Sequence, residues 1–208
     1  MAQPFLTDAA KQALSDAVRD VESRCSAEVV VAVRARSGSY LHADLIAGIL
    51  TALAGLIALL FSPWPFDLVW FVIDPLLAGA LGGLLASRLP AVRRALTFQK
   101  VRRRHVETAA RATFVEKGIH ATTGRTGVLV YISLLEHEAV VVHDLGVEPL
   151  VTTDHWRLAV EEIEEAVRRG EDGVALAALV RALGDVLAPA LVRGAQDLDE
   201  LTNEVSER

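Results

Sequence analysis

Two apolar stretches dominate the first half of this 208-residue chain: ADLIAGILTALAGLIALLF at residues 43–61 and LVWFVIDPLLAGALGGLLAS at residues 68–87. The first, as a helix rising about 1.5 Å per residue, would extend about 28 Å, close to the hydrocarbon thickness of a bilayer. A pair of buried helices in a soluble protein is the alternative. A chain of this length is too small to enclose two such helices on every side, so we expect both to span a membrane.

The short segment between the two stretches, SPWP at residues 62–65, contains two prolines, which helix interiors tolerate poorly. We therefore expect the chain to turn back here and form a transmembrane helical hairpin over residues 43–87. Aromatic residues gather near this turn, as they do at membrane surfaces. They are Trp64, Phe66, Trp70 and Phe71.

Small residues recur along both expected helices. Ala47, Thr51 and Gly55 lie in the first, and Gly79 and Gly83 lie in the second. Such residues let membrane helices approach each other closely. The pattern predicts close packing, and it leaves open whether the packing occurs within the hairpin or between two copies in a homodimer.

Asp74 is the one charged residue of the second stretch. An acid at membrane depth is costly and often functional. The following Pro75 favours another interpretation, because Asp is a common N-cap and Pro a common first helical residue. We expect the second helix to begin at Pro75, with residues 67–73 lying in the membrane interface.

Basic residues flank the hairpin on both sides but are missing from its turn. Arg34 and Arg36 precede it, and seven Lys or Arg residues follow it between Arg88 and Arg104. By the positive-inside rule, both chain ends and the soluble domain should face the cytoplasm of a bacterial inner membrane. Residues 1–4 do not resemble the start of a signal peptide.

The formal net charge of −6 hides an uneven distribution, because the Arg88–Arg104 segment is strongly basic while the rest is acidic. A basic segment directly after a membrane helix has a natural partner in anionic lipid headgroups. Nucleic acid is the rival partner, but the acidic remainder of the domain would repel its phosphates. We expect contact with lipid and none with nucleic acid.

The remaining sequence alternates helical and strand patterns around a turn at Glu136 and His137. The expected helices cover residues 7–24 (capped by Thr7 or Asp8), 97–116, 152–169 (capped by Thr152 or Thr153) and 173–188, and the expected strands cover 28–34, 127–133 and 139–143. This order predicts an α/β fold in which a small mixed sheet is covered by helices on both faces and is interrupted by the two-helix transmembrane hairpin. Residues 1–42 and 88–192 would form the two parts of the soluble domain, and residues 193–208 an acidic, disordered tail.

Three segments resemble the TPM domain family, which is named for a thylakoid lumen protein, a photosystem II repair protein and a modulator of acetylcholine receptors. They are SRCSAEVVVAV, GRTGVLVYISLLEHEAVVVHDLGVE and a following helix that begins with an Asp and contains Trp156. The likeness covers about residues 6–191 without the hairpin, and the chain is similar to the bacterial membrane subgroup that carries this insertion. The resemblance implies phosphatase activity, metal binding, or a role in assembling and repairing membrane complexes.

The family's Gly-Tyr-Gly-Leu-Glu pattern corresponds here to DLGVE at residues 144–148. Gly146 and Glu148 match it, whereas the first glycine and the tyrosine are replaced. The next family Asp would be Asp154. The paired acids usual near the family's N-terminus are reduced to Asp8, which puts acid-dependent chemistry in doubt.

Three carboxylates after the last strand are the candidates for chemistry. Asp144, Glu148 and Asp154 could together bind calcium or magnesium, or act as acid and base, and Arg125 in the preceding polar loop could hold a phosphate. The structural alternative is that Asp144 and Glu148 are solvated loop residues and that Asp154 favours the positive end of a helix.

Other reactive residue types receive structural explanations. The single Cys25 excludes an internal disulfide and a cysteine-based metal cluster. His137 and Glu138 flank the hairpin turn and are expected to be exposed. No Ser-His-Asp arrangement is evident in the sequence.

Two functions follow from these observations. The first is an accessory or interaction module, anchored in the inner membrane, that serves another membrane protein or complex. The second is a divalent-metal-dependent phosphatase that uses Asp144, Glu148 and Asp154, with Arg125 binding the phosphate.

Overall fold

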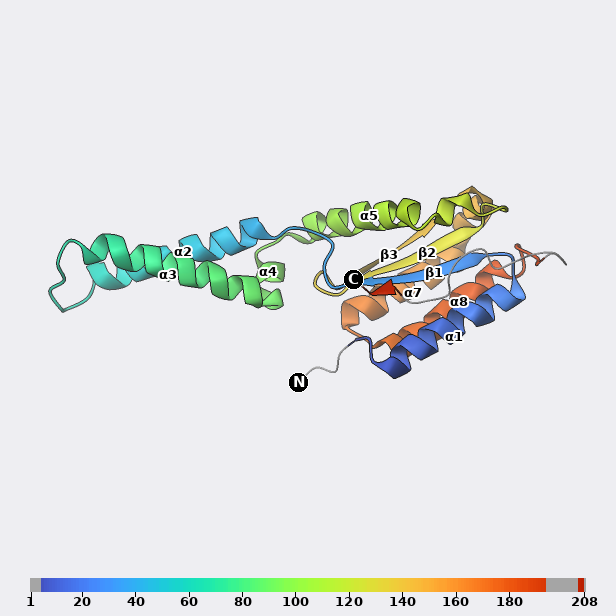
Figure 1. The fold of residues 1–208 in the computed structure, drawn as a ribbon, viewed down its shortest axis with the longest axis horizontal. Coiled ribbons are helices and arrows are strands. Elements are labelled where there is room, and N and C mark those ends of the chain that lie inside the picture. The colour runs from blue at the N-terminus through green and yellow to red at the C-terminus, as the bar shows by residue number, and fades with distance from the viewer. Residues whose placement is uncertain (1–4, 194–205, 208) are drawn as a thin grey trace. The chain divides into compact units, whose positions relative to one another are not determined.

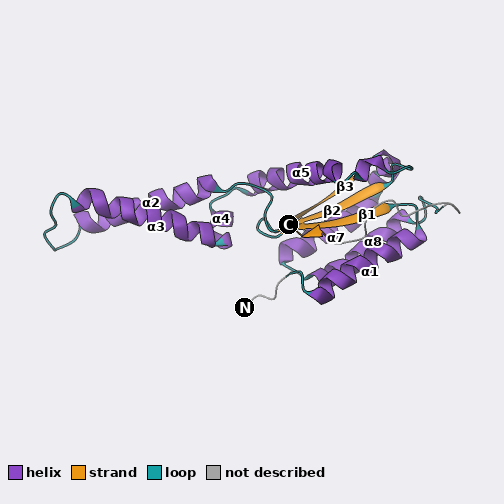
Figure 2. Cartoon of the chain, viewed as in Figure 1, coloured by secondary structure: helices purple, strands orange, loops and turns teal. Residues whose placement is uncertain are grey.

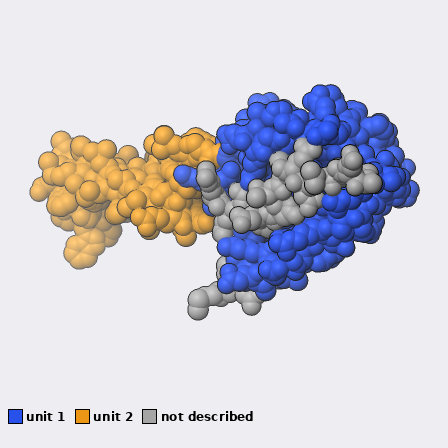
Figure 3. Space-filling view, turned by 45° about the vertical axis from the view of Figure 1, so that its right-hand side comes forward, with its two compact units in different colours: residues 1–37, 103–208 blue, residues 38–102 orange. Residues whose placement is uncertain are grey.

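The computed structural model describes residues 5–193 and 206–207. The chain divides into two compact units, which Figure 3 shows in different colours. Unit 1 comprises residues 1–37 and 103–208, and unit 2 comprises residues 38–102. Most described residues are helical, and the strands are confined to unit 1 (Figure 2).

Unit 1 is built on a small mixed sheet with the strand order β3-β2-β1-β4. Its strands are β1 (Glu28–Arg34), β2 (Gly127–Ser133), β3 (Glu138–His143) and the two-residue β4 (Ser206–Glu207). β1 runs parallel to β2 and β4, while β3 is antiparallel to β2. The expected small mixed sheet is therefore present.

Three helices pack on one face of this sheet (Figure 1). They are α1 (Asp8–Arg24), α7 (Asp154–Arg169) and α8 (Gly173–Leu187). Their apolar stripes meet alternate residues of the strands, because successive strand side chains point to opposite faces. The buried strand residues on this face are Val29, Val31, Val33, Val128, Val130, Ile132 and Ala139.

A single long helix, α5 (Gln99–Glu116), covers the other face of the sheet (Figure 1). Its buried residues Val106, Ala110 and Phe114 pack against the remaining strand residues, which include Ala32 and Tyr131. Helices thus lie on both faces, as expected from the element order. α5 also provides the crossover that joins β1 to the parallel strand β2.

Side-chain caps fix where the helices begin. The Thr7 hydroxyl accepts a hydrogen bond from Ala10 N at 3.1 Å, and the Thr153 hydroxyl accepts one from Trp156 N at 3.3 Å. Of the cap alternatives left open above, Thr7 and Thr153 are therefore the ones used. Gly170 ends α7 with a φ of 76°, a conformation that favours glycine.

Short helices complete unit 1. They are η1 (Ile119–Ala121), η2 (Leu145–Val147) and α6 (Glu148–Val151). The tail expected to be disordered, residues 193–208, lies largely outside the described residues. Its described pair, Ser206 and Glu207, forms β4 beside Ala32 and Val33 of β1.

Unit 2 consists of α2 (Leu41–Leu60), α3 (Trp70–Arg88) and the short helix α4 (Pro90–Ala95). α2 and α3 are long and apolar enough to cross a membrane by length and composition. Only 17% and 6% of their most apolar windows are buried. Unit 2 extends beyond the expected hairpin of residues 43–87 because it includes α4 and the start of α5.

Small residues bring α2 and α3 into close contact within the hairpin. A Cβ on Gly48 would lie 2.8 Å from the Gly79 carbonyl oxygen, and one on Gly83 would lie 3.1 Å from the Asp44 carbonyl oxygen. The Thr51 hydroxyl donates across the pair to the Ala78 carbonyl at 3.1 Å. Packing inside the hairpin therefore accounts for these residues without a second copy.

The expected start of the second apolar helix at Pro75 is wrong. α3 begins at Trp70 after the N-cap residue Val69, so Asp74 and Pro75 lie inside the helix. The first turn forms before the proline, with Ile73 N donating to Val69 O at 3.1 Å. Pro75 lacks only its own N–H, and the loss of one hydrogen bond near the end of a helix does not prevent the helix from starting earlier.

Candidate functional site

The first candidate site lies at the amino-terminal end of β2, beside the end of the antiparallel strand β3. Arg125 and Asp144 form an ion pair there, with Nη2 of Arg125 3.1 Å from Oδ1 of Asp144. Asp144 is buried and also accepts a hydrogen bond from Leu145 N at 2.7 Å. Arg125 is therefore bound to a carboxylate of the chain itself, and it could take a phosphate only by sharing or leaving Asp144.

The other two predicted carboxylates point into solvent. The Asp154 side chain is 83% exposed and pairs with Arg157 on the next turn of α7 at 2.9 Å. The Glu148 side chain is 65% exposed and lies 3.8 Å from Nδ1 of His143. Among the described residues, no group of three or more His, Cys, Asp or Glu side chains could hold a metal ion. The structure thus does not assemble Asp144, Glu148 and Asp154 into a calcium or magnesium site.

Gly146, which matches the family pattern, has a packing role in this loop. Its N–H donates to the Arg125 carbonyl at 2.8 Å. A Cβ at this position would lie 2.7 Å from the carbonyl oxygens of both Arg125 and Gly124. Close approach of two backbone segments therefore explains this glycine without a ligand.

The turn between β2 and β3, at the opposite end of these two strands, contains buried acids. Glu136 is 1% exposed and Glu138 is 2% exposed, so the expected exposure of Glu138 is wrong. Glu138 opens β3 on the face that α5 covers, where its Oε2 lies 3.6 Å from Nη1 of Arg103. A cation from the covering helix compensates for the burial of this carboxylate.

Arg103 links α5 to α7 at this end of the sheet, near the start of β3. Its guanidinium binds both carboxylate oxygens of Glu164, at 2.9 and 2.8 Å, and also reaches Glu107 at 3.2 Å. The hydrogen bonds to Glu164 raise the pKa of Arg103, so its charge is permanent. In unit 2, Arg93 similarly binds Asp44 at 2.9 and 2.7 Å. Two of the basic residues expected at lipid headgroups therefore bind carboxylates of the chain.

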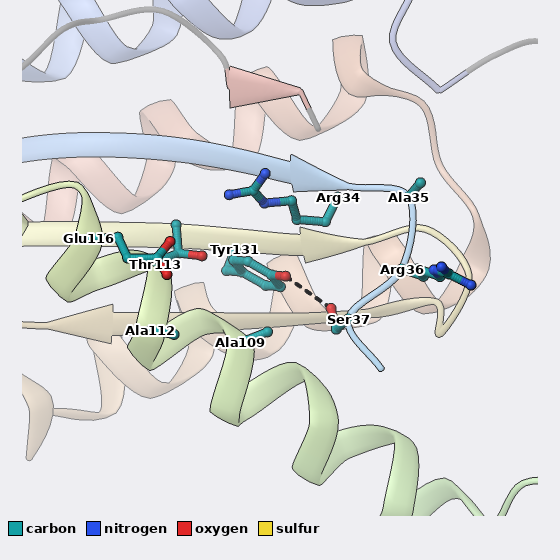
Figure 4. A pocket seen from close by; sticks show the side chains of 9 residues that line it. All are labelled: Arg34, Ala35, Arg36, Ser37, Ala109, Ala112, Thr113, Glu116 and Tyr131. Carbon is teal, nitrogen blue, oxygen red and sulfur yellow. Dashed lines mark hydrogen bonds between the residues drawn. The ribbon is translucent and has the colours of Figure 1, made fainter. Parts of the chain in front are cut away.

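A cavity of about 470 Å³ lies at the carboxyl ends of the parallel strands β1 and β2, beside α5 (Figure 4). We call it the Arg34 pocket. Two arginines and three hydroxyl side chains give its polar character, and α5 contributes two alanines, one of these hydroxyls and one acid. Its lining consists of Arg34, Ala35, Arg36, Ser37, Ala109, Ala112, Thr113, Glu116 and Tyr131.

A chain of hydroxyl groups connects this pocket to the buried Glu136. Tyr131 Oη lies 3.0 Å from Ser37 Oγ (Figure 4), and Ser37 Oγ donates to Ser133 Oγ at 2.6 Å. The Ser133 hydroxyl donates in turn to the Glu136 carboxylate, which also accepts from Ser37 N at 2.8 Å. Ser37 donates to Ser133 and Ser133 donates to Glu136, so the hydrogens of both serines point away from Tyr131 and toward the acid.

The parallel pairing of β1 and β2 brings these groups together. Arg34 is the register partner of Ser133, and Ala32 is the partner of Tyr131. From the sequence alone, Arg34 indicated only the expected membrane orientation. The available signal was its position at the end of a strand in an α/β sheet, where ligands often bind.

Comparison with known proteins adds the fold only. No family model and no curated protein matches this chain. One similar solved structure is the NMR structure of BA42 protein from the psychrophilic bacterium Bizionia argentinensis, with 19% identity and a TM-score of 0.61. The match covers 100% of this chain and 99% of that chain. At this identity the likeness supports a shared fold and carries no function to this chain.

Proposed function

We propose that this protein is a TPM-like α/β domain anchored in a bacterial inner membrane by the α2–α3 hairpin, where it serves a membrane protein or complex as an accessory module. One observation carries the proposal, namely the exposed apolar surface of unit 2. Ile49, Leu53, Leu76 and Leu81 are all more than half exposed. Contiguous apolar surfaces of this extent mark sites that contact a membrane or another protein.

A bilayer suits this surface better than a soluble partner does. The apolar residues occur along both helices of the pair, and each helix has the length needed to cross the hydrocarbon region. In a bilayer, a helix satisfies its own backbone hydrogen bonds, so a two-helix hairpin needs no further cover.

The accessory role rests on the geometry of the predicted catalytic residues. Arg125 and Asp144 bind each other, and Asp154 is paired with Arg157. Salt bridges of this kind hold loops and helix starts in place. They give the metal-dependent phosphatase no assembled centre, and so we favour an interaction module.

The location is tested with reporters fused after Arg208 of the full chain. If the charge bias sets the topology, a reporter active only in the periplasm stays silent and a cytoplasmic fluorescent reporter is bright. A matched control has one further transmembrane helix between Arg208 and the reporter. This helix should carry the reporter into the periplasm and so reverse both signals. The opposite result with the unmodified chain would place unit 1 outside the cytoplasm.

The accessory role is tested by assaying hydrolysis of a phosphomonoester by the purified full chain, across pH, with magnesium, calcium or neither. We expect no turnover above that of the buffer. Turnover that is lost in the Asp144→Ala variant but kept in an Asp185→Ala control would replace the accessory role with the phosphatase.

A further inference from the structure

The two arginines of the Arg34 pocket differ from most arginines of unit 1. Arg24, Arg103, Arg125 and Arg157, for example, each bind a carboxylate. Within the described residues, neither Arg34 nor Arg36 forms an ion pair with an acid, and Arg34 instead donates a hydrogen bond to the Tyr131 hydroxyl. The protein therefore places two positive charges at one cavity, in a chain whose net charge is −6.

The pocket lining has one acid beside these two arginines. Glu116 lies on α5 beside Thr113 (Figure 4), and it is exposed to solvent. The buried Glu136 is occupied by Ser37 N and the Ser133 hydroxyl. Among the described residues, the pocket lining thus contains two arginines and one acid, and the charge of Glu136 lies close to Tyr131.

Tyr131 supplies a hydrogen-bond donor to the same cavity. Because Ser37 donates its hydrogen to Ser133, the Tyr131 hydroxyl is the donor in its 3.0 Å contact with Ser37 Oγ, and it would have to turn from Ser37 to donate to a ligand. Burial raises the pKa of Tyr131, which keeps its hydroxyl protonated at neutral pH.

We propose that the Arg34 pocket binds a phosphate group, with Arg34 supplying charge and Tyr131 a hydrogen bond, and with the exposed Arg36 side chain turning in from the position drawn in Figure 4 to add a second charge. Guanidinium groups match the spacing of phosphate oxygens and bind them in a bidentate manner. A pocket at the carboxyl ends of parallel strands is a common position for such ligands. Its volume of about 470 Å³ leaves room for the rest of a phosphorylated molecule.

The phosphate could belong to a soluble compound or to a lipid headgroup. Ser37 lies four residues before Leu41, where α2 begins, and at about 3.6 Å per residue the two are no more than about 14 Å apart. If α2 enters a bilayer, headgroups lie within reach of the pocket. This lipid source, but not phosphate binding itself, rests on the proposed membrane anchor.

The test uses the full chain in nanodiscs of neutral lipid and inorganic phosphate as the probe, titrated at constant ionic strength. We expect saturable binding that Arg34→Gln weakens at least tenfold and Tyr131→Phe weakens severalfold. If Arg34→Gln does not fold, Arg36→Gln, at an exposed position, takes its place and should also weaken binding. The control is Arg111→Gln, which removes an exposed arginine of α5 outside the pocket and should bind like the wild type.

No saturable binding by the wild type would overturn the proposal, as would equal affinities of the Arg34, Arg36 and Arg111 variants. A second titration in nanodiscs that contain phosphatidylglycerol separates the two sources. A weaker apparent affinity for phosphate there indicates competition from lipid headgroups, and an unchanged affinity indicates a soluble phosphorylated ligand. Phosphate binding can be measured whether or not the hairpin proves to be a membrane anchor, so the two proposals fail independently.

Discussion

Glu136 shows how a single buried acid connects two loops at one end of the sheet. It accepts hydrogen bonds from Ser37 N and Ser133 Oγ, and through them it sets the direction of the hydroxyl chain that ends at Tyr131. A buried carboxylate with several donors is stable only while those donors remain. The side chain therefore joins the loop after β1 to the turn after β2.

Glu136→Gln should destabilise unit 1, because the amide replaces one of the two accepting oxygens with an NH2 donor, which then faces a group that also donates. We expect a loss of about 1–3 kcal/mol in the free energy of unfolding, seen as a lower Tm for the detergent-solubilised chain. Glu116→Gln, at an exposed position, serves as the matched control. An equal Tm for the two variants would mean that Glu136 does not hold this network.

Gly146→Ala tests the packing explanation for the glycine that matches the family pattern. Its Cβ would meet two backbone carbonyls at 2.7 Å, and neither can move as a side chain could. We expect a destabilisation of about 1–3 kcal/mol, measured by thermal unfolding. Gly124→Ala should cost less, since its Cβ would meet only the Thr126 side chain, at 3.3 Å or more. The explanation fails if Gly146→Ala is as stable as the wild type.

Cys25 offers a check on the core that needs no mutation. Burial raises the pKa of its thiol, so at pH 8 the folded protein holds less thiolate than a free cysteine does. Labelling by a thiol reagent should be at least tenfold slower in the native chain than in the same chain unfolded in guanidinium. Comparable rates would show that the α1–β1 junction is open to solvent.

At the residue scale, the sequence narrowed each of two helix caps to two neighbouring residues, Thr7 or Asp8 and Thr152 or Thr153, because capping depends on residues close together in the chain. It did not predict the Arg34 pocket, since Ser37 and Glu136 meet only through the pairing of β1 with β2. The burial of Glu138 was missed for the same reason. Its partner Arg103 belongs to a helix on another part of the chain.

The elements of unit 1 were easier to predict than its site. Strands at residues 28–34 and 127–133 have continuous apolar runs bounded by polar residues, and the structure has them at these positions. The start of α3 was predicted five residues too late, because Asp74-Pro75 has the composition of a helix start. Local composition cannot show that hydrogen bonds from residues 70–73 have already begun the helix.

The short helix α4 is held to α2 by one ion pair, and Asp44→Asn should release it. Arg93 and Asp44 are each 14% exposed, and removing one partner leaves a poorly solvated guanidinium at a cost of about 1–3 kcal/mol. We expect faster amide hydrogen exchange over residues 90–95. Asp67→Asn, in the exposed turn, should leave this exchange unchanged. Unaltered exchange in Asp44→Asn would show that apolar packing holds α4.

For the whole molecule, the central feature is the insertion of unit 2 between β1 and α5. The chain leaves unit 1 after residue 37 and returns at residue 103, so the crossover from β1 to β2 contains the entire hairpin. The sheet can still form, because β1 and β2 pair in one continuous register from Glu28–Gly127 to Arg34–Ser133. Unit 1 thus retains an α/β fold while unit 2 provides the proposed anchor.

Alkaline extraction of membranes from cells that produce the full chain tests this proposed anchor most directly. We expect the protein to stay with the lipid pellet, and a variant with residues 38–102 replaced by a short glycine-serine linker to move to the supernatant. A peripheral membrane protein serves as the control and should move to the supernatant. If the full chain moved there with it, the result would contradict a membrane-spanning hairpin and with it the account of unit 2.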